Sequence, residues 1–264
     1  MNKISFLGPK SSFTHEAALI AFPNNELVEK KTIMEVFESV EKKETTFGVV
    51  PIENSSGGSV AFTLDELVSG EFFINKEFFL EIKQNLAGNC ELEEIKKIYS
   101  HPQGFIQCQN WLKNNLKEIE LIETTSTSKA AEISSKEKNS AAICSTLAAK
   151  EFNLKIIQAS INDDKENTTR FVIISKNKNQ EKENKKSSII FGVKNEPGSL
   201  FNALEAFKKF KINMTKIESR PSKKKKWEYL FFIDFEGNLE ETNIKNAIKE
   251  IEKNCVEVIL LGSY

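Results

Sequence analysis

From Lys3 to Ser175, short apolar runs alternate with segments of helical period. The apolar runs predict buried strands at Ile4–Leu7, Phe47–Ile52, Ile95–Tyr99, Ala141–Cys144 and Phe171–Ile174. One helix is predicted over Phe13–Phe22, and another begins at the capping box Thr32–Glu35. A third helix ends at Leu67, a fourth begins at Pro102, and a fifth follows Thr124–Ser128. Strand, loop and helix repeated in this order predict an α/β architecture with mostly parallel strand pairing.

The pattern changes at residues 176–188, a highly charged stretch without apolar residues that predicts a linker. The elements expected beyond it are a strand, a helix, two strands, a helix and a strand: Ile189–Val193, Ser199–Phe210, Ile212–Ser219, Trp227–Phe235, Asn243–Lys253 and Val256–Leu261. This β-α-β-β-α-β order predicts a ferredoxin-like module, which serves more often in regulation or binding than in catalysis. We therefore divide the chain into a domain over 1–176, a linker over 177–187 and a second domain over 188–264. Lys223–Lys226 would form the tip of the hairpin between the central strands, either solvated or as an anion patch.

Composition narrows the class of protein. The chain has 264 residues, of which 39% are hydrophobic, and a net charge of −1. It therefore has enough apolar material for ordinary cores, and it lacks the basic face that nucleic acid requires. Neither a basic and apolar leader nor an apolar run of about 18 residues is present, so we expect no membrane association and a cytoplasmic location.

The cysteines and histidines give no metal-site pattern. The four cysteines are widely spaced and the chain has two histidines. We expect free thiols, without a structural zinc or a disulfide framework.

Arginine is rare in this chain. Of 37 Lys and Arg residues, 35 are lysines, which leaves Arg170 and Arg220. An arginine kept against such a bias is a candidate for bidentate binding of a carboxylate. Arg170 lies in Asn167–Phe171 and Arg220 in Glu218–Pro221. These positions indicate either two structural ion pairs or a carboxylate-binding site in each half of the chain.

Three hydroxyl-rich loops, Lys10–Ser12, Ser55–Ser59 and Thr124–Ser128, each precede a predicted helix. Helix N-termini present free N–H groups and the positive end of the helix dipole. Each loop alone is typical of an N-cap. Together, and beside an arginine, they favour a cleft for a small molecule with more than one carboxylate. No glycine pattern for a dinucleotide or a phosphate loop is present.

Thr169, Arg170 and Phe171 begin a predicted strand, so Arg170 should face away from the other two, although a cleft at the strand's start could reach both faces. A threonine hydroxyl is a weak acid and would act by donating a hydrogen bond to a leaving oxygen. His101, before Pro102, is either a capping or core residue or part of a site.

These motifs together resemble the monofunctional prephenate dehydratase family over nearly the whole chain. The resemblance rests on segments in the family's order: Phe6–Lys10 with Phe13–Ala18, Gly48–Ser55, Ser100–Gln103 with Gln107, and Asn167 with Thr169–Phe171. Gly198, Ser199, Leu200 and Phe201, and Glu218, Ser219, Arg220 and Pro221, are similar to the two phenylalanine-binding motifs of an ACT domain.

The resemblance implies a two-lobed catalytic domain, α/β and similar to a periplasmic binding protein, followed by the ferredoxin-like ACT domain. It implies conversion of prephenate to phenylpyruvate without a cofactor or metal. Thr169 would hydrogen-bond the departing hydroxyl, within a signature completed by Phe171. Arg170 and the loops at Ser12, Asn54, Ser55 and Ser126 would hold substrate carboxylates. Glu53 would act as an acid or as a hinge residue.

The resemblance also implies feedback control by L-phenylalanine. The effector would bind at the two ACT motifs, with Glu218 closing over it and Arg220 either bracing the strand end or contacting the ligand. Pairing of ACT domains would give a homodimer or a homotetramer. A chain ending near Ser175 is then expected to keep activity and to ignore phenylalanine.

Two departures from the family pattern affect these expectations. Ser11-Ser12 stands where Gly-Thr is usual, and Ser199 and Phe201 stand where an alanine and an aliphatic residue are common. Arogenate is an alternative substrate, and a non-catalytic amino-acid sensor is an alternative of another class. Because the first predicted strand begins by Ile4, no fused chorismate mutase is expected.

Overall fold

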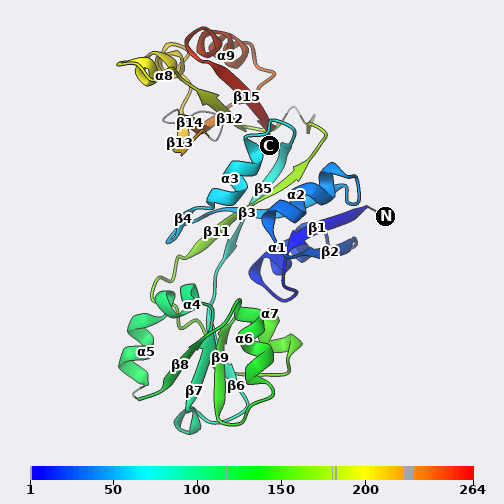
Figure 1. Cartoon of the computed structure of the whole chain (residues 1–264), viewed down its shortest axis with the longest axis vertical. Helices are drawn as coiled ribbons and strands as arrows, with labels where there is room; N and C mark the ends of the chain where they lie inside the picture. The colour runs from blue at the N-terminus through cyan, green and yellow to red at the C-terminus, as the bar shows by residue number, and fades with distance from the viewer. Residues whose placement is uncertain (1, 117, 180, 182, 223–228) are drawn as a thin grey trace.

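The computed structural model describes residues 2–116, 118–179, 181, 183–222 and 229–264. Three bodies follow one another along the long axis of the molecule: a second lobe at one end, a first lobe in the middle and the C-terminal domain at the other end (Figure 1). The expected tip at Lys223–Lys226 and the start of the expected strand at Trp227 lie outside the described residues.

The first lobe is built on a sheet with the order β2-β1-β3-β11-β5, to which β4 adds by pairing with β3. Its strands are β1 (Lys3–Leu7), β2 (Glu26–Lys30), β3 (Phe47–Asn54), β4 (Gly58–Ser59), β5 (Phe73–Glu81) and β11 (Thr168–Ser175). Its helices are α1 (Phe13–Ala21), α2 (Ile33–Glu41) and α3 (Ala61–Leu67). Helix α2 begins where the capping box predicted, with the Thr32 hydroxyl accepting from the N–H of Glu35 at 3.1 Å.

The second lobe is a separate sheet with the order β10-β6-β9-β7-β8. Its strands are β6 (Asn85–Gly88), β7 (Lys97–Ser100), β8 (Glu120–Glu123), β9 (Ser140–Cys144) and β10 (Lys155–Gln158). Its helices are the 3-10 turn η1 (Leu92–Glu94), α4 (Pro102–Gln107), α5 (Gln109–Asn115), α6 (Thr127–Ser134) and α7 (Thr146–Glu151). Two crossing segments join the lobes and bond to each other, through Ile82 N–H to the Asn167 carbonyl and Ile161 N–H to the Gln84 carbonyl.

The expectation of mostly parallel pairing is wrong for the described strands of these lobes. Among the strands that the structure describes in the two lobes, only β1 with β2 and β3, and β7 with β8 and β9, pair in parallel. The other pairs are antiparallel, including those of β11 with both β3 and β5. The reason is the double crossing. Strand β5 leaves the first lobe and β11 returns to it, so the returning strand runs against its neighbours.

The C-terminal domain has the expected βαββαβ order. Its elements are β12 (Lys186–Gly192), α8 (Ser199–Lys209), β13 (Met214–Pro221), β14 (Tyr229–Glu236), α9 (Thr242–Asn254) and β15 (Glu257–Ser263), and the sheet order is β13-β14-β12-β15. Strand β12 begins earlier than predicted. Ser187 and Ser188, at the end of the polar stretch, are fully buried because they pair across the sheet and hydrogen-bond there.

One hydrophobic core crosses the boundary between the first lobe and the C-terminal domain. One face of the C-terminal sheet packs against α8 and α9, and the other adds its side chains to the core beneath α2 and α3. The residues of the C-terminal domain in this shared core are Ile190, Leu230, Phe232 and Leu261, and those of the first lobe include Phe37, Leu67, Phe72, Ile74 and Ile174. Each large apolar side chain buried in this way contributes roughly 1.5–3 kcal/mol. The two parts are therefore distinct in topology but continuous in packing.

Two further sequence expectations can be compared with the structure. All four cysteines are free thiols, with Cys108 and Cys144 buried and Cys90 and Cys255 partly buried. Among the described residues, no helix is both long and apolar enough to cross a bilayer.

Candidate active site

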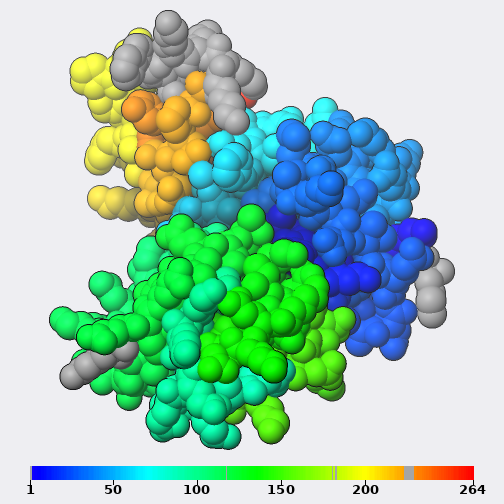
Figure 2. Space-filling view, turned by 60° about the horizontal axis from the view of Figure 1, so that its bottom comes forward, coloured from blue at the N-terminus to red at the C-terminus, as the bar shows by residue number. Residues whose placement is uncertain are grey.

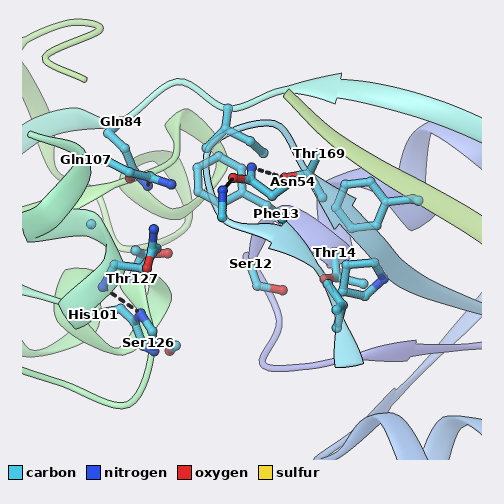
Figure 3. Close-up of a pocket in the computed structure, with 18 of the residues that line it drawn as sticks. Ser12, Phe13, Thr14, Asn54, Gln84, His101, Gln107, Ser126, Thr127 and Thr169 are labelled. Atoms are coloured by element: carbon cyan, nitrogen blue, oxygen red, sulfur yellow. Dashed lines mark hydrogen bonds between the residues drawn. The ribbon is translucent and has the colours of Figure 1, made fainter. Parts of the chain in front are cut away.

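A cleft of about 460 Å³ lies between the two lobes. Figure 3 shows Ser12, Thr14, Asn54 and Thr169 of the first lobe facing Gln84, Gln107, His101 and Thr127 of the second. The other residues of the lining are Phe13, Pro51, Gly57, Gly58, Ser59, Val60, Ile82, Gln103, Gly104, Thr125, Ser126 and Phe171. The size suits a small molecule of the kind that such clefts enclose.

Helices from both lobes begin at this cleft. Ser12 caps α1 by accepting from His15 N–H at 3.3 Å, and Ser126 caps α6 by accepting from Lys129 N–H at 3.0 Å. Since the first N–H groups of a helix have no acceptor within it, the starts of both helices offer donors and the positive end of the helix dipole to the cleft. His101 combines the two roles left open by sequence, because its Nδ1 caps α4 and its side chain lines the cleft.

None of the described residues that line the cleft is an aspartate, glutamate, lysine or arginine. A carboxylate bound here would be held by helix N-termini, hydroxyls and side-chain amides rather than by a cationic side chain. Such neutral donors can bind an anion without the strong attraction of a buried opposite charge.

Asn54 fixes the hydroxyl of Thr169. The Asn54 Oδ1 accepts from the N–H groups of Ser56 (3.0 Å) and Gly57 (2.8 Å), which sets the orientation of the amide. Its Nδ2 then donates to Thr169 Oγ1 at 2.9 Å and to Asn167 Oδ1 at 2.8 Å. Because one lone pair of the Thr169 oxygen is occupied by this donor, the hydroxyl proton is free to be donated into the cleft.

Alternation along β11 separates the members of the Thr-Arg-Phe motif. Thr169 and Phe171 line the cleft, whereas Arg170 does not. Its guanidinium, 4% exposed, extends from the opposite face of the sheet toward the C-terminal domain. The expectation that Arg170 holds a substrate carboxylate is therefore replaced by the other alternative from sequence, a structural ion pair.

The partners of Arg170 form a buried cluster that spans the domain boundary. Its Nη1 lies 2.5 Å from Asp234 Oδ2, and its Nη2 donates to the hydroxyl of Tyr264 at 2.9 Å. Its Nε lies 2.6 Å from Glu77 Oε2, an ion pair without a hydrogen bond because the N–H is not directed at that oxygen. Ser188 hydrogen-bonds both Asp234 and Tyr264. Burial, with a second contribution from Asp234, raises the pKa of Tyr264, which keeps that hydroxyl protonated.

Glu53 and Ser55 also lie outside the cleft lining. Glu53 pairs with Arg170 across the ladder, faces the same way and reaches Lys216 of β13 at 2.8 Å. Ser55 exchanges hydrogen bonds with the backbone of Thr168, which joins β3 to β11 beside the cleft. Glu53 and Ser55 therefore hold the backbone beside the cleft in place and do not line the cleft themselves. Of the residues expected at the site, the structure brings Ser12, Asn54, Ser126, Thr169 and Phe171 together.

The two expected effector motifs lie on α8 and β13. Gly198 caps α8 with φ of 84°, a conformation that favours glycine, and Ser199 and Leu200 start the helix while Phe201 is 70% exposed. Of the second motif, Ser219 and Pro221 alternate with Glu218 and Arg220 along β13. Glu218 accepts a hydrogen bond from Ser59, and Arg220 pairs with Asp65 at 3.2 Å, so both side chains contact the first lobe. The roles expected of Glu218 and Arg220 toward the effector stay predictions, and the contacts with Ser59 and Asp65 are an additional feature that sequence did not predict.

The departure at Ser11 has a structural counterpart. Ser11 has φ of 64°, in the left-handed region where glycine carries no penalty, and it is buried. Its N–H donates to His15 Nδ1 at 2.9 Å, and the His15 ring stacks on Phe6. Ser145 donates to the Ser11 carbonyl at 3.2 Å and Ser128 to that of Lys10 at 2.6 Å. The loop before α1 is thus tied to the second lobe.

Sequence reasoning assigned no role to several lining residues. Thr14 follows Phe13 in the opening motif, Thr127 follows Ser126, and Gln107 lies in the third motif. Their positions within or beside these segments could have identified them as candidate site residues. Gln84 gave none. Its side chain is 3% exposed and its amide donates to Gln107 Oε1 at 3.0 Å, while its own Oε1 accepts no hydrogen bond from the residues that the structure describes.

The fold and the cleft define a class: a two-lobed α/β domain with a small-molecule cleft between its lobes and a ferredoxin-like domain attached. The family model described as prephenate dehydratase matches residues 4–179, and that described as ACT domain matches residues 187–253. The chain belongs to the prephenate dehydratase family.

Curated relatives align along most of the chain. The bifunctional chorismate mutase/prephenate dehydratase of Aquifex aeolicus is 42% identical over 264 residues, which cover 99% of this chain and 73% of that protein. The prephenate dehydratase of Methanocaldococcus jannaschii is 39% identical over 237 residues, 88% of this chain and 85% of that one. The chloroplastic arogenate dehydratase/prephenate dehydratase 2 of Arabidopsis thaliana is 34% identical over 276 residues, 99% of this chain and 72% of that one.

Solved structures share the whole architecture. The prephenate dehydratase of Arthrobacter aurescens in complex with L-Phe superimposes with a TM-score of 0.90 at 29% identity, covering 99% of this chain and 89% of that one. GqqA, described as a novel type of quorum quenching acylase, gives a TM-score of 0.90 at 25% identity, covering 99% and 97%.

Proposed function

We propose that this chain converts prephenate to phenylpyruvate in the interlobe cleft, as a step in L-phenylalanine biosynthesis. The observation that supports it most directly is the Thr169 hydroxyl, oriented by Asn54 at 2.9 Å and facing an uncharged cleft lined by helix N-termini. In a member of the prephenate dehydratase family, that hydroxyl is placed to donate to a departing oxygen.

The reaction is balanced without a redox partner. The bond from the ring carbon to its hydroxyl breaks, and so does the bond to the ring carboxylate. The electron pair of the latter enters the ring, which becomes aromatic, and carbon dioxide leaves. The hydroxide takes up a proton from solvent and leaves as water. Thr169 contributes a hydrogen bond that strengthens as negative charge grows on the leaving oxygen, a differential interaction that lowers the barrier.

The absence of charged side chains among the described lining residues suits this chemistry. Prephenate carries two carboxylates, of which one is retained and one leaves as neutral carbon dioxide. A lysine or arginine bound to the departing carboxylate would stabilise the ground state more than the transition state. N–H groups at the starts of α1 and α6, which Ser12 and Ser126 cap, would bind a carboxylate less strongly than a cationic side chain.

The ACT domain is proposed to bind L-phenylalanine and to inhibit the enzyme. The Arthrobacter aurescens relative was solved with L-Phe. The loop before α8, with Gly198 at its cap, presents N–H groups suited to an amino-acid carboxylate. A module of this size encloses an amino acid best where two copies pair, so we propose a homodimer or homotetramer formed through ACT domains, in the cytoplasm.

Arogenate is the second candidate substrate, because the Arabidopsis thaliana relative is named for both activities. Prephenate would give the 2-oxo acid phenylpyruvate, which an ultraviolet assay detects. Arogenate has an amino group in place of the oxo group and would give L-phenylalanine, which chromatography detects, so the two assays run side by side test both substrates. We expect prephenate to be turned over. No product from either substrate would contradict the proposal and would favour an amino-acid sensor.

Amide hydrolysis, suggested by the name of GqqA, has less support in the cleft. A serine or threonine nucleophile requires a neighbouring base. In the described part of the chain, neither histidine ring is hydrogen-bonded to a serine or threonine hydroxyl, since His15 Nδ1 and His101 Nδ1 both accept from backbone N–H groups. An N-acylated amino compound incubated in the same assay series is expected to remain intact.

A further inference from the structure

Strand β13 touches the first lobe through every second residue. Lys216 Nζ lies 2.8 Å from Glu53 Oε1, Glu218 Oε2 accepts from the Ser59 hydroxyl at 3.1 Å, and Arg220 Nη2 lies 3.2 Å from Asp65 Oδ1. We call Lys216, Glu218 and Arg220 the β13 ladder. Its charges alternate in sign, and its three partners follow the same order along β3, β4 and α3.

The two-residue period of a strand explains why these side chains share a face. Ile217, between two members of the ladder, pairs with Ile233, which belongs to the core beneath α8 and α9. Glu218 pairs with Phe232, which belongs to the core shared with the first lobe. The ladder therefore faces the catalytic domain. Figure 2 shows the orange part of the C-terminal domain against the cyan part of the first lobe.

The ladder meets the first lobe at the wall of the cleft. Ser59 lines the cleft, and Glu53 is followed directly by Asn54, which holds Thr169. Ser59 belongs to β4, a strand of two residues whose pairing with Glu53 and Asn54 forms the hairpin at this wall. So short a strand has little stability of its own.

The hydroxyl of Ser59 is hydrogen-bonded to two side chains of the ACT domain. Lys216 Nζ donates to Ser59 Oγ at 2.8 Å, and that hydroxyl donates to Glu218 Oε2. The Lys216 side chain is only 9% exposed, so its ammonium is held in place between Glu53 and Ser59. A hydroxyl that accepts from one side chain and donates to another follows both when they move.

We propose that the β13 ladder positions the Gly58–Ser59 wall of the cleft, and that an amino acid bound to the ACT domain changes substrate binding through the contacts of Lys216 and Glu218 with Ser59. Glu218 and Arg220 belong to the motif expected to bind the effector, yet their side chains are engaged by the first lobe. In this arrangement the same strand carries Ser219 and Pro221 on its other face. A shift of β13 on ligand binding therefore acts directly on the wall.

The inference rests on the proposed dehydratase activity, and turnover of prephenate by the wild-type chain without effector tests that activity separately. The first experiment measures KM and kcat of the full chain for Lys216→Met, Ser59→Ala and the double variant. Lys216→Met is expected to raise KM for prephenate about fivefold or more, within the range of typical coupling, with little change in kcat. On the Ser59→Ala background, the same substitution is expected to change KM by less than about twofold, since pairs that act through one contact are not additive.

A matched control is Lys249→Met, the same substitution on α9, which packs on the other face of the ACT sheet. It is expected to leave KM unchanged. An equal rise in KM for both lysine variants, or additive effects of Lys216→Met and Ser59→Ala, would overturn the positioning role.

The second experiment separates coupling from effector binding. Glu218→Gln keeps the shape of the side chain and removes its charge. We expect calorimetry to show L-phenylalanine bound with an affinity within about threefold of wild type, while inhibition at saturation falls about fivefold or more. Loss of binding would assign Glu218 to the effector site, and unchanged inhibition would remove it from the route. Either result would contradict the inference.

Discussion

Thr169 and Arg170 are neighbours in β11, yet the side chain of one lines the substrate cleft and that of the other is buried against Asp234 of the ACT domain. The peptide bond between these two residues directly connects the cleft with the buried ion-pair cluster at the boundary to the ACT domain. A displacement of the β11 backbone at Arg170 would therefore also move the backbone that carries the Thr169 hydroxyl.

Replacing Thr169 tests the proposed chemistry. Thr169→Ala is expected to fold normally, since only a methyl and a hydroxyl are lost, and to lower kcat by about 10²–10⁴-fold because the donor to the leaving hydroxyl is gone. Thr169→Ser keeps the hydroxyl and should retain a measurable fraction of activity. The steady-state assay for phenylpyruvate decides between them. An alanine variant with more than about a tenth of wild-type kcat, one step of about 1.4 kcal/mol, would exclude the catalytic role.

Removing Arg170 is expected to affect stability first. Arg170→Met removes the nearer cation of the fully buried Asp234 and leaves it with Lys186 at 3.8 Å. Breaking a buried pair in this way costs about 3–5 kcal/mol. Chemical denaturation should show that loss, and the double variant Arg170→Met with Asp234→Asn should recover part of it. A stable Arg170→Met variant with a large rise in KM would instead restore the sequence-based hypothesis of carboxylate binding.

Truncation at Ser175 now has a different expected outcome from the one that sequence alone predicted. The shared core would lose Ile190, Leu230, Phe232 and Leu261, which exposes apolar side chains of the first lobe such as Phe37 and Leu67. Arg170 would lose Asp234 as well. We therefore expect the truncated chain to aggregate or to melt well below the full-length protein. Light scattering and a thermal melt compare the two, and a monodisperse, active fragment would contradict this expectation.

Acidic pH should weaken the loop that begins α1. Burial, aided by the nearby Lys10, lowers the pKa of His15 from its ordinary value of 6.5. A group with a depressed folded-state pKa favours the folded protein above its unfolded pKa, and that contribution disappears as pH falls through the folded value. Protonated Nδ1 can no longer accept from Ser11 N–H, so KM should also rise below pH 6.5.

Proton NMR can follow His15 directly, because the chain has two histidines and His101→Gln would assign the remaining ring. The His15 resonances should titrate below pH 6.5 in the wild-type protein. Titration at or above that value would show that the ring is not held neutral by its surroundings.

Much of the fold followed from local pattern. The ferredoxin-like order could be predicted because its helices have single apolar stripes and its strands are flanked by turns. Strand β5 was missed because its sequence, FINKEFFLE, mixes charged residues with a run of apolar ones and shows no clear alternation. Strands β8 and β10 were missed because both are four-residue edge strands with polar ends.

The candidate site was predictable to the extent that it depended on residue order. Strand alternation placed Thr169 and Phe171 together and Arg170 opposite. The family motifs supplied Asn54, and the hydroxyl-rich loops before helices supplied Ser12 and Ser126. What lay against the other face of β11 could not be predicted. Asp234 is 64 residues away along the chain, and nothing in its local sequence marks it as a partner of Arg170.

The position of β11 has a consequence for synthesis on the ribosome. This strand is inserted between β3 and β5, so the first lobe cannot close its sheet until residues 168–175 have emerged, after the entire second lobe. At about 5–20 residues per second, the 87 positions from Glu81 to Thr168 take roughly 4–17 s. During that interval the second lobe, contiguous in sequence, can complete its own sheet. Until β11 is available, the edge of β3 that it will pair with stays open. An open strand edge is where a nascent chain is most exposed to pairing with a wrong partner.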